Sequence, residues 1–209
     1  MIRALEDLLA AVDRTTAHAT FAVTASVAVR DDAGAPATSR GYCDLDVPLV
    51  ASAWTTVGGP SHPGLLHGTS LHLGMPEWLS LDVHGVAVSE LLPLYWLRAA
   101  TAAVDQGDGL LSVQVDLEAA ADANPPAVAR SLRHDELGPL QAAGGTATGT
   151  VHLDAAGLVR RVDLAVAGGN PLTVVLTLDP VARRPLDPAV VVPGADLGAV
   201  VGDLIDPRG

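Results

Sequence analysis

The sequence predicts an α+β fold in which a strongly curved antiparallel sheet, an incomplete β-barrel, is wrapped around or covered by helices. Several segments alternate apolar and polar residues with a period of two, as strands with one buried face do. Helical patterns are few and do not alternate regularly with the strands, which argues against a parallel doubly wound sheet. The 209 residues fit a single domain spanning positions 1–209.

The first two predicted elements are a helix and a strand. Apolar residues follow helical spacing from Ile2 to Val12, with charged residues between them. This spacing predicts an amphipathic helix over Ile2–Asp13 that covers an apolar surface. From Thr20 the period changes to two, and the residues that share one face of this strand are Phe21, Val23, Ala25, Val27 and Val29.

The next part of the chain is rich in strand patterns. One long alternating run predicts a strand from Arg40 to Val57, in which Pro48 marks an edge position or a bulge. The segment GGPSHPG then interrupts the pattern with turn residues. Two shorter strands are predicted after it, at 69–75 and at 78–84.

A second helix is predicted from Glu90 to Val104, with Pro93 in its first turn, where proline is tolerated. The segment LLSVQVDL that follows is predicted to be a strand. NPPAVARSLRHDELGPLQAAGG, which opens with prolines, is predicted to form one or two short helices.

A β-hairpin is predicted in the segment TATGTVHLDAAGLVRRVDLAV. Its arms alternate on either side of a turn in which Asp154 supplies local hydrogen bonds and Gly157 permits a positive φ. LTVVLTLDP is the last predicted strand, and a tail punctuated by prolines follows it. The prediction therefore holds seven or eight strands.

Composition excludes several classes of function. The net charge of −12 disfavours contact with phosphate backbones, so nucleic acid is not an expected partner. All twelve basic residues are Arg, and without Lys the chain cannot form a Schiff base, anchor pyridoxal phosphate or build a Walker A site. Cys43 is the only cysteine, which rules out an intrachain disulfide and a zinc knuckle. No cofactor is expected.

The location of the protein is left open by its sequence. Glu6 and Asp7 interrupt the region where a signal peptide would need an apolar stretch. No run reaches the roughly 18 apolar residues of a membrane span, so no integral membrane segment is expected. As written the chain would be cytoplasmic, whereas a trimmed precursor would be extracytoplasmic.

Side chains with reactive groups form no recognisable catalytic or metal-binding motif. The histidines of the middle segment lack the spacing of a metal site; they are His62, His67, His72 and His84. If an acid–base pair exists, Asp82 and His84 are the best candidates, because they share a strand face. Cys43 is interpreted as a small core residue and the Arg160–Arg161 and Arg183–Arg184 pairs as surface charge.

Bulky apolar residues indicate a second apolar environment beside the core. Trp54 and Trp78 fall on the faces of their predicted strands opposite the main apolar set, and Tyr95 and Trp96 lie within the second helix. That environment is either a ligand cavity or the space beneath loops. The predicted cavity lining is Trp54, Leu71, Leu73, Met75, Trp78, Tyr95 and Trp96.

The order of elements resembles a known family. A VQVDLEAAADA strand running into a short helix, the VHLDAAGLVRRVDL hairpin and the VVVPGADLGAVVGDL tail resemble the LolA-like lipoprotein-carrier fold, especially the LppX/LprG-like lipoproteins of actinobacteria. The resemblance implies an incomplete barrel around an apolar cavity that takes acyl chains. The chain departs from the family in having no lipobox, and Cys43 lies within a strand pattern, so membrane anchoring is not carried over.

Three functions follow from these observations. The favoured one is binding, with or without transfer, of a hydrophobic small molecule such as a lipid in the apolar cavity. The alternative is a cofactor-independent enzyme of the cyclase or isomerase type that acts on a hydrophobic substrate in the same cavity. The third is a structural or interaction domain whose interior is filled by its own side chains. Whether the protein is an enzyme stays open, with binding preferred.

Overall fold

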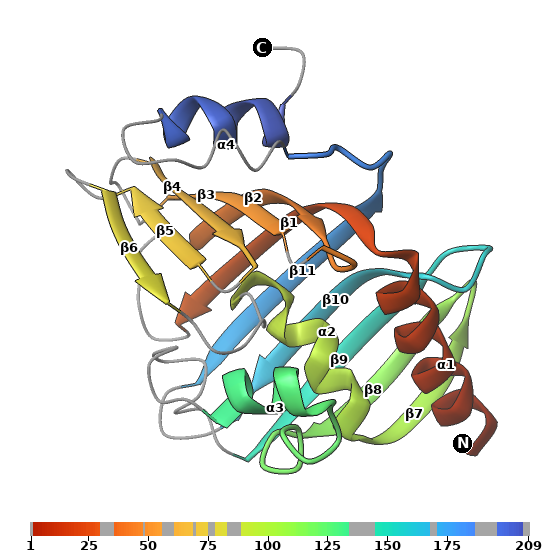
Figure 1. Cartoon of the computed structure of the whole chain (residues 1–209). Helices are drawn as coiled ribbons and strands as arrows, with labels where there is room; N and C mark the ends of the chain where they lie inside the picture. The colour runs from red at the N-terminus through yellow and green to blue at the C-terminus, as the bar shows by residue number, and fades with distance from the viewer. Residues whose placement is uncertain are drawn as a thin grey trace.

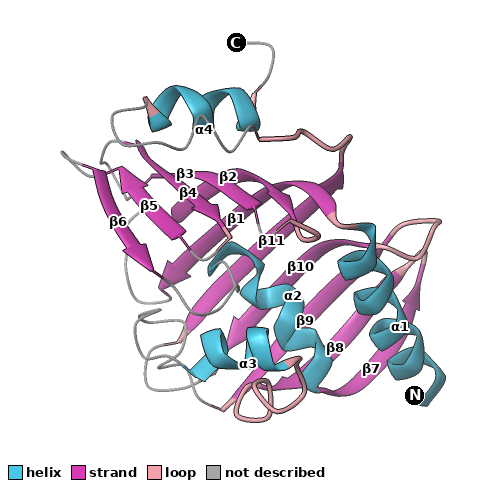
Figure 2. Cartoon of the chain, in the orientation of Figure 1, coloured by secondary structure: helices cyan, strands magenta, loops and turns pink. Residues whose placement is uncertain are grey.

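The computed structural model describes residues 2–29, 36–47, 49–55, 61–68, 70–74, 78–82, 89–133, 145–167, 171–186 and 196–206. Within these ranges the helices are α1 (Ile2–His18), α2 (Leu92–Trp96), α3 (Pro126–Arg133) and α4 (Leu197–Ile205), with 3₁₀ turns η1 (Ser89–Leu91) and η2 (Leu97–Ala99) on either side of α2. Figure 2 shows helices and strands in separate colours.

Eleven strands of the described chain form one sheet. They are β1 (Thr20–Val29), β2 (Ala37–Asp44), β3 (Leu49–Thr55), β4 (Ser61–His67), β5 (Ser70–Gly74), β6 (Trp78–Asp82), β7 (Ala100–Gly107), β8 (Leu110–Asp116), β9 (Thr146–Leu153), β10 (Val159–Val166) and β11 (Leu172–Pro180). Their spatial order is β6-β5-β4-β3-β2-β1-β11-β10-β9-β8-β7, and each neighbouring pair is antiparallel (Figure 1). Since the described residues of β6 and β7 do not pair, the sheet is open, which confirms the α+β incomplete barrel.

The sheet consists of two meanders joined by its first and last strands. β1 pairs with β11 continuously, from Phe21 opposite Pro180 to Val29 opposite Leu172. The join is extended past the strand ends, where the Thr20 hydroxyl donates to the Val181 carbonyl at 2.7 Å. The strands before α2 therefore continue directly into the strands after it.

The two faces of the sheet are covered by different helices. We call the face that carries Phe21 and Val23 the inner face; it holds the main core, to which α1, α2 and α3 also contribute. On the opposite, outer face, a second buried cluster packs under α4 across β2–β4. Figure 1 shows α4 set apart from the other three helices. The outer cluster is Tyr42, Leu49, Ala51, Leu65, Leu197, Val201 and Leu204.

A buried threonine attaches α1 to the sheet. The Thr15 hydroxyl donates to the Ala11 carbonyl at 2.7 Å and accepts the backbone N–H of Val159, the first residue of β10, at 2.8 Å. Thr15 is fully buried, so this hydroxyl satisfies a backbone donor that has no water to bind. At the same end of α1, Arg98 forms an ion pair with Asp13 at 2.7 Å.

Two adjacent arginines attach the chain after β11 to β2. Arg183 Nε lies 2.7 Å from Oδ2 of the buried Asp44, and its Nη2 bonds to Asp46. Arg184 stacks over the Tyr42 ring, with 5.4 Å from its Cζ to the ring centroid. It also donates to the carbonyls of Leu204 and Ile205 at the end of α4, where unpaired carbonyls need donors.

Several expected elements are confirmed. The N-terminal helix is present and continues beyond Asp13 to His18. β1, β8 and β11 occur where alternation predicts them. The predicted hairpin is β9–β10: the Asp154 carboxylate accepts the N–H groups of Ala156 and Leu158, both at 2.9 Å, and Gly157 has φ +75°.

The single strand expected from Arg40 to Val57 is wrong. The chain turns after Asp44, so this segment is the hairpin β2–β3, with Cys43 opposite Val50. The Asp44 carboxylate accepts the N–H of Asp46 at 3.1 Å, a local bond that favours a turn. Pro48 lies outside the described residues. Alternation continues through the turn in the sequence, which is why periodicity does not detect it.

Three more elements differ from expectation. β4 (Ser61–His67) begins inside the GGPSHPG segment interpreted as a break and continues three residues beyond it. Its Pro63 lies just outside the part of β4 that pairs with β5, which begins at Gly64. The helix expected over 90–104 ends at Ala99, and Ala100 begins the edge strand β7. The tail contains α4, whose first turn is capped by the Asp196 carboxylate.

Replacing Gly149 by Ala is expected to destabilise the fold. Gly149 in β9 lies opposite Leu164 in β10, and a Cβ at this position would overlap the Asp163 carbonyl oxygen. Because that oxygen belongs to the backbone, relief requires the strands to separate, and we expect a loss of about 2–3 kcal/mol in the free energy of unfolding. Chemical denaturation followed by circular dichroism measures this loss.

Gly202→Ala is the matched control for that variant. A Cβ at Gly202 in α4 meets no atom within 4 Å, so the same substitution should leave stability unchanged or raise it by up to about 1 kcal/mol. Equal effects of the two substitutions would show that the strands are not closely packed at Gly149.

Thr15→Val is expected to weaken the attachment of α1. The variant keeps the volume but leaves the Val159 N–H buried without an acceptor, at a cost of about 1–3 kcal/mol. Thr16→Val carries the same change one residue later, where the hydroxyl bonds only to carbonyls of its own helix and to Arg98. Denaturation of both variants should show the larger loss for Thr15→Val, and a reversed order would contradict the role of Thr15.

Candidate functional site

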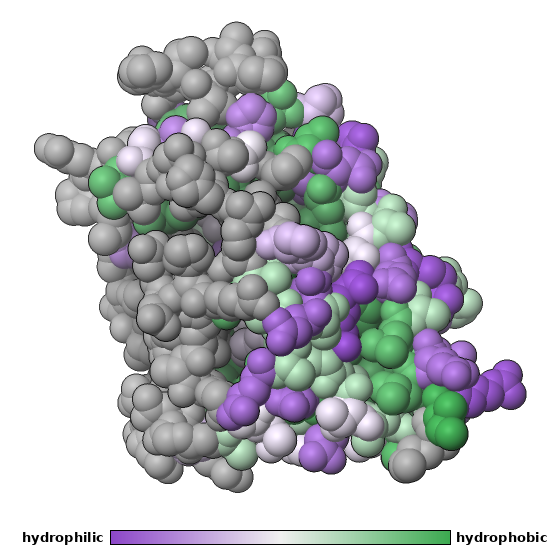
Figure 3. Space-filling view, turned by 60° about the horizontal axis from the view of Figure 1, so that its bottom comes forward, coloured by the Kyte–Doolittle hydropathy of each residue, from purple (hydrophilic) through white to green (hydrophobic). Residues whose placement is uncertain are grey.

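One part of the inner face carries apolar side chains that are not fully buried. The large apolar residues of the described chain that are exposed lie on different elements: Ile2 in α1, Val47 in a turn, Leu79 in β6 and Val104 in β7. In Figure 3 the apolar surface of the described part is most evident at the lower right, towards the N-terminal end of α1. Of these four residues only Leu79, 48% exposed, lies on the inner face.

Leu79 belongs to a group of leucines at the β6 end of the sheet. It pairs with Leu73 of β5, which is half-buried, and Leu71, two residues earlier on the same face, is also half-buried and packs against the core. We call the inner face of β4–β6 that these three leucines occupy the half-open face. Neighbouring apolar side chains left partly uncovered are a feature of surfaces that bind other molecules.

The inner-face residues of β2–β5 form three rows across the strands. The first, which we call the apolar row, runs into the main core and consists of Cys43, Val50, Leu66 and Leu71. The second, the small row, consists of Gly41, Ser52, Gly64 and Leu73. The third, the polar row, includes Ser39 and His62, with the backbone of Trp54 between them.

The small row has side chains that are small or absent between the apolar row and the polar row. Gly41 and Gly64 are buried and have no side chain, and Ser52 between them is 7% exposed. A Cβ on Gly41 would lie 2.6 Å from the Ala51 carbonyl oxygen, so β2 and β3 approach too closely there for any larger residue. The small row therefore carries little side-chain volume from Gly41 to Gly64 and ends at the larger Leu73.

A carboxylate is bonded to the polar row. The Ser39 hydroxyl donates to Glu90 Oε1 at 2.9 Å, which brings η1 over β2. Burial raises the pKa of the Cys43 thiol to about 12, and the charges of Asp44 and Glu90 add to that increase.

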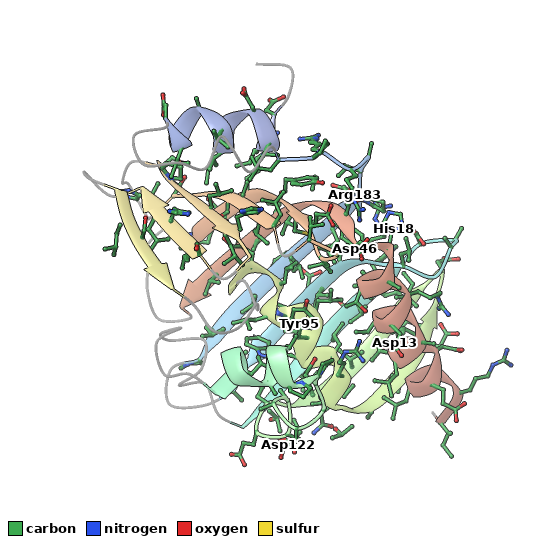
Figure 4. The ribbon with its side chains drawn as sticks, viewed as in Figure 1. Asp13, His18, Asp46, Tyr95, Asp122 and Arg183 are labelled. Carbon is green, nitrogen blue, oxygen red and sulfur yellow. The ribbon has the colours of Figure 1, made fainter. Side chains whose placement is uncertain are left out.

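Of the predicted lining residues, the structure brings Leu71 and Leu73 together on the half-open face. Tyr95 and Trp96 are elsewhere: α2 packs against β10 and β11, and both side chains are buried in the main core. Figure 4 labels Tyr95 on α2. Burial raises the pKa of Tyr95 to about 12.

The remaining predicted site residues are only partly described. Met75 and His84 lie outside the described residues, and the side chains of Trp54, Trp78 and Asp82 are likewise not among those described. The register places Trp54 opposite Ser39 and His62, on the inner face, and Trp78 opposite Gly74, on the outer face. The sequence predicts Trp54 on the face opposite Cys43, whereas the register puts the two residues on the same face. The turn after Asp44 changes the phase of the alternation and so causes this difference.

The arginine pairs are occupied by acidic and carbonyl partners within the chain. Arg160 bonds to Asp154 and Asp179, and Arg161 to Asp163. Figure 4 shows Arg183 next to Asp46. Across the part of the chain that the structure describes, no group of three or more His, Cys, Asp or Glu side chains could hold a metal ion. None of the described helices is both long and apolar enough to cross a membrane.

Sequence reasoning did not identify Ser39, Gly41 and Glu90 as part of a site. Ser39 and Glu90 are 51 positions apart, and neither belongs to a motif. The only local signal is a glycine inside a strand pattern, since Gly41 interrupts the alternation of β2 and so indicates a close approach of backbones.

Comparison with known proteins supports the fold. No protein-family model matches the sequence, and no curated protein matches it. Among solved structures, LprF from Mycobacterium bovis is 12% identical with a TM-score of 0.54, covering 90% of this chain and 98% of its own. The lipoprotein LppX from Mycobacterium tuberculosis is 15% identical with a TM-score of 0.52, covering 86% and 97%.

A LolA superfamily protein from Nitrosomonas europaea also matches, at 11% identity and a TM-score of 0.41, over 90% of this chain and 97% of its own. The fold assignment rests on the two mycobacterial structures. They confirm the resemblance to the LolA-like and LppX/LprG-like fold, and at these identities the similarity establishes the fold alone.

Cys43 is expected to be unreactive in the folded protein. Its pKa of about 12, against a usual 9.0, lowers the thiolate fraction near neutral pH about a thousandfold. Modification by an aromatic disulfide reagent near pH 8 should therefore be slow in buffer and complete in urea. Rapid reaction of the native protein would show that the apolar row is open to solvent.

Proposed function

We propose that this protein binds a hydrophobic ligand, such as a lipid, on the half-open face, and that the described elements act as one ligand-binding domain. The observation that carries the proposal is the placement of three partly exposed leucines, Leu71, Leu73 and Leu79, on one face beside the small row. A folded chain rarely leaves such a group partly uncovered unless another molecule covers it.

The energetics of the half-open face support this proposal. Covering apolar surface contributes roughly 25 cal/mol per Å², so completing the burial of three partly exposed leucines would add a few kcal/mol to binding. The ligand gains the same contribution from its own apolar surface. The Gly and Ser residues of the small row leave room for a chain to lie across the strands instead of ending at a filled core.

The likeness to solved structures agrees with this proposal. LppX, which shares the fold, is named a lipoprotein, and the family resemblance in the sequence implies a cavity that takes acyl chains. Transfer of the ligand to another carrier or membrane would require its release, for which the open edge at β6 lies directly next to Leu79.

Native mass spectrometry of the purified protein, followed by solvent extraction, tests the proposal directly. We expect a stoichiometric apolar species, or an empty protein that binds the neutral fluorophore N-phenyl-1-naphthylamine with enhanced fluorescence. A protein that carries no ligand and does not enhance the fluorescence of N-phenyl-1-naphthylamine would refute the proposal.

The variant Leu73→Asn tests whether the fluorophore binds at the half-open face. Leu73 ends the small row and pairs with Leu79, so a polar side chain there should weaken fluorophore binding about five- to tenfold. Val104→Asn is the matched control, because Val104 is 47% exposed at the other edge of the sheet, and should leave the affinity unchanged. Equal effects of the two variants would place the fluorophore away from the half-open face.

A further inference from the structure

One buried side chain of the main core ends in a polar group without a partner. Tyr95 in α2 is 7% exposed, and its hydroxyl makes no hydrogen bond, although its backbone carbonyl accepts Asn124 Nδ2 at 2.9 Å. The other tyrosine, Tyr42, shows the usual arrangement, because its hydroxyl accepts the backbone N–H of Arg184 at 2.9 Å. An unpaired hydroxyl on a buried side chain indicates that something outside the chain binds it.

The Tyr95 hydroxyl is not sealed off by the surrounding side chains. Enclosed polar atoms that lack a hydrogen-bond partner include Arg98 Nε and Asn124 Oδ1 among the described side chains, but not the Tyr95 oxygen. Because that oxygen also lacks a partner, it differs from these atoms in not being enclosed. A space that admits at least a water molecule therefore adjoins the end of a ring that is otherwise buried.

A second unpaired donor lies one helical turn away. Arg98 follows Tyr95 by three residues, which puts both on the same side of the α2–η2 turn. Arg98 Nε is buried without an acceptor, although Nη1 of the same guanidinium bonds to Asp13 at 2.7 Å. An acceptor oxygen suits two such donors. Since the charge of Arg98 is already paired, a neutral carbonyl suits this place better than a carboxylate.

Tyr95 is also next to the row of residues that leads to the half-open face. Burial is the main cause of the raised pKa of Tyr95, the Cys43 thiol adds to the increase, and the Arg98 guanidinium opposes it, so both groups lie near the hydroxyl. Cys43 is the first residue of the apolar row, and Leu71 at its other end lies on the half-open face. The row crosses three strand spacings, about 14 Å, which one extended apolar molecule can span.

We propose that the hydrophobic ligand carries a neutral carbonyl oxygen, as an ester or a ketone does, and that the Tyr95 hydroxyl donates a hydrogen bond to it. The apolar part of the ligand extends from Tyr95 toward Leu71 and Leu73 on the half-open face. This inference rests on the proposed function and adds the chemical class of the polar group and the residue that binds it. A hydrocarbon of the same size would gain no such bond.

The test uses the fluorophore Laurdan, in which a ketone joins a naphthalene ring to a long alkyl chain. Its emission moves to longer wavelengths when the ketone accepts a hydrogen bond. The protein is titrated into Laurdan kept too dilute to self-associate and, in parallel, into N-phenyl-1-naphthylamine, which has no carbonyl. For Tyr95→Phe we expect about three- to tenfold weaker binding of Laurdan and emission at shorter wavelengths, with unchanged binding of N-phenyl-1-naphthylamine.

Tyr42→Phe is the matched control, because it removes the same hydroxyl from the outer cluster. In this variant the backbone N–H of Arg184 loses its acceptor, so the protein should unfold at a lower temperature but bind Laurdan as the wild type does. Tyr95→Phe removes an unpaired hydroxyl and should unfold at the same temperature as the wild type or higher. A clearly lower unfolding temperature of Tyr95→Phe would show that its hydroxyl is bound within the folded chain, against the inference.

The possible results separate this inference from the proposed function. If N-phenyl-1-naphthylamine binds in a Leu73-dependent way but Laurdan does not bind, or binds Tyr95→Phe with wild-type affinity and emission, this inference is wrong and the proposed function stands. An equal loss of both fluorophores in Tyr95→Phe would assign Tyr95 to packing alone and would also contradict the inference. If neither fluorophore binds the wild-type protein, both proposals are wrong.

Discussion

The pairing of β1 with β11 is the interaction on which the rest of the structure depends. It joins segments that are distant in the sequence. At its end, the hydrogen-bonded residues Thr20 and Val181 are 161 positions apart. Without it the chain would hold two separate meanders, each with an uncovered apolar face and two open edges. With it, the inner faces of both meanders form one surface that the helices can cover. Because contacts of such long range are slow to form, we expect this join to be completed late in folding.

Once the two meanders are joined, the helices divide the sheet into differently covered parts. α1 and α2 bury the inner face of the C-terminal meander and of β1, whereas α4 buries the outer face of β2–β4. The strands β2–β4 therefore carry apolar residues on both faces, as Tyr42 and Cys43 show at adjacent positions. The inner face toward β6 receives the least cover from the described helices, and the partly exposed leucines lie there.

The candidate site is a consequence of this arrangement and not of any single segment. η1 contacts β1, and β2 is the neighbour of β1, so Glu90 comes within hydrogen-bonding distance of Ser39. On the same face of β2, Gly41 permits the close approach of β2 and β3, because a Cβ there would lie 2.6 Å from the Ala51 carbonyl oxygen.

The sequence by itself determined the local elements whose signals are strong and complete. The alternation in β1, β8 and β11, the amphipathic spacing of α1 and the Asp154–Gly157 turn all predict what the structure contains, because side-chain period and turn chemistry act over a few residues. The tertiary structure alone decided where a continuous alternation turns, as it does after Asp44, and which face of a strand meets the core. It also decided that Ala100–Gly107 is a strand and that Ser39 meets Glu90. These outcomes depend on hydrogen bonds and burial between distant segments, which periodicity along one segment does not contain.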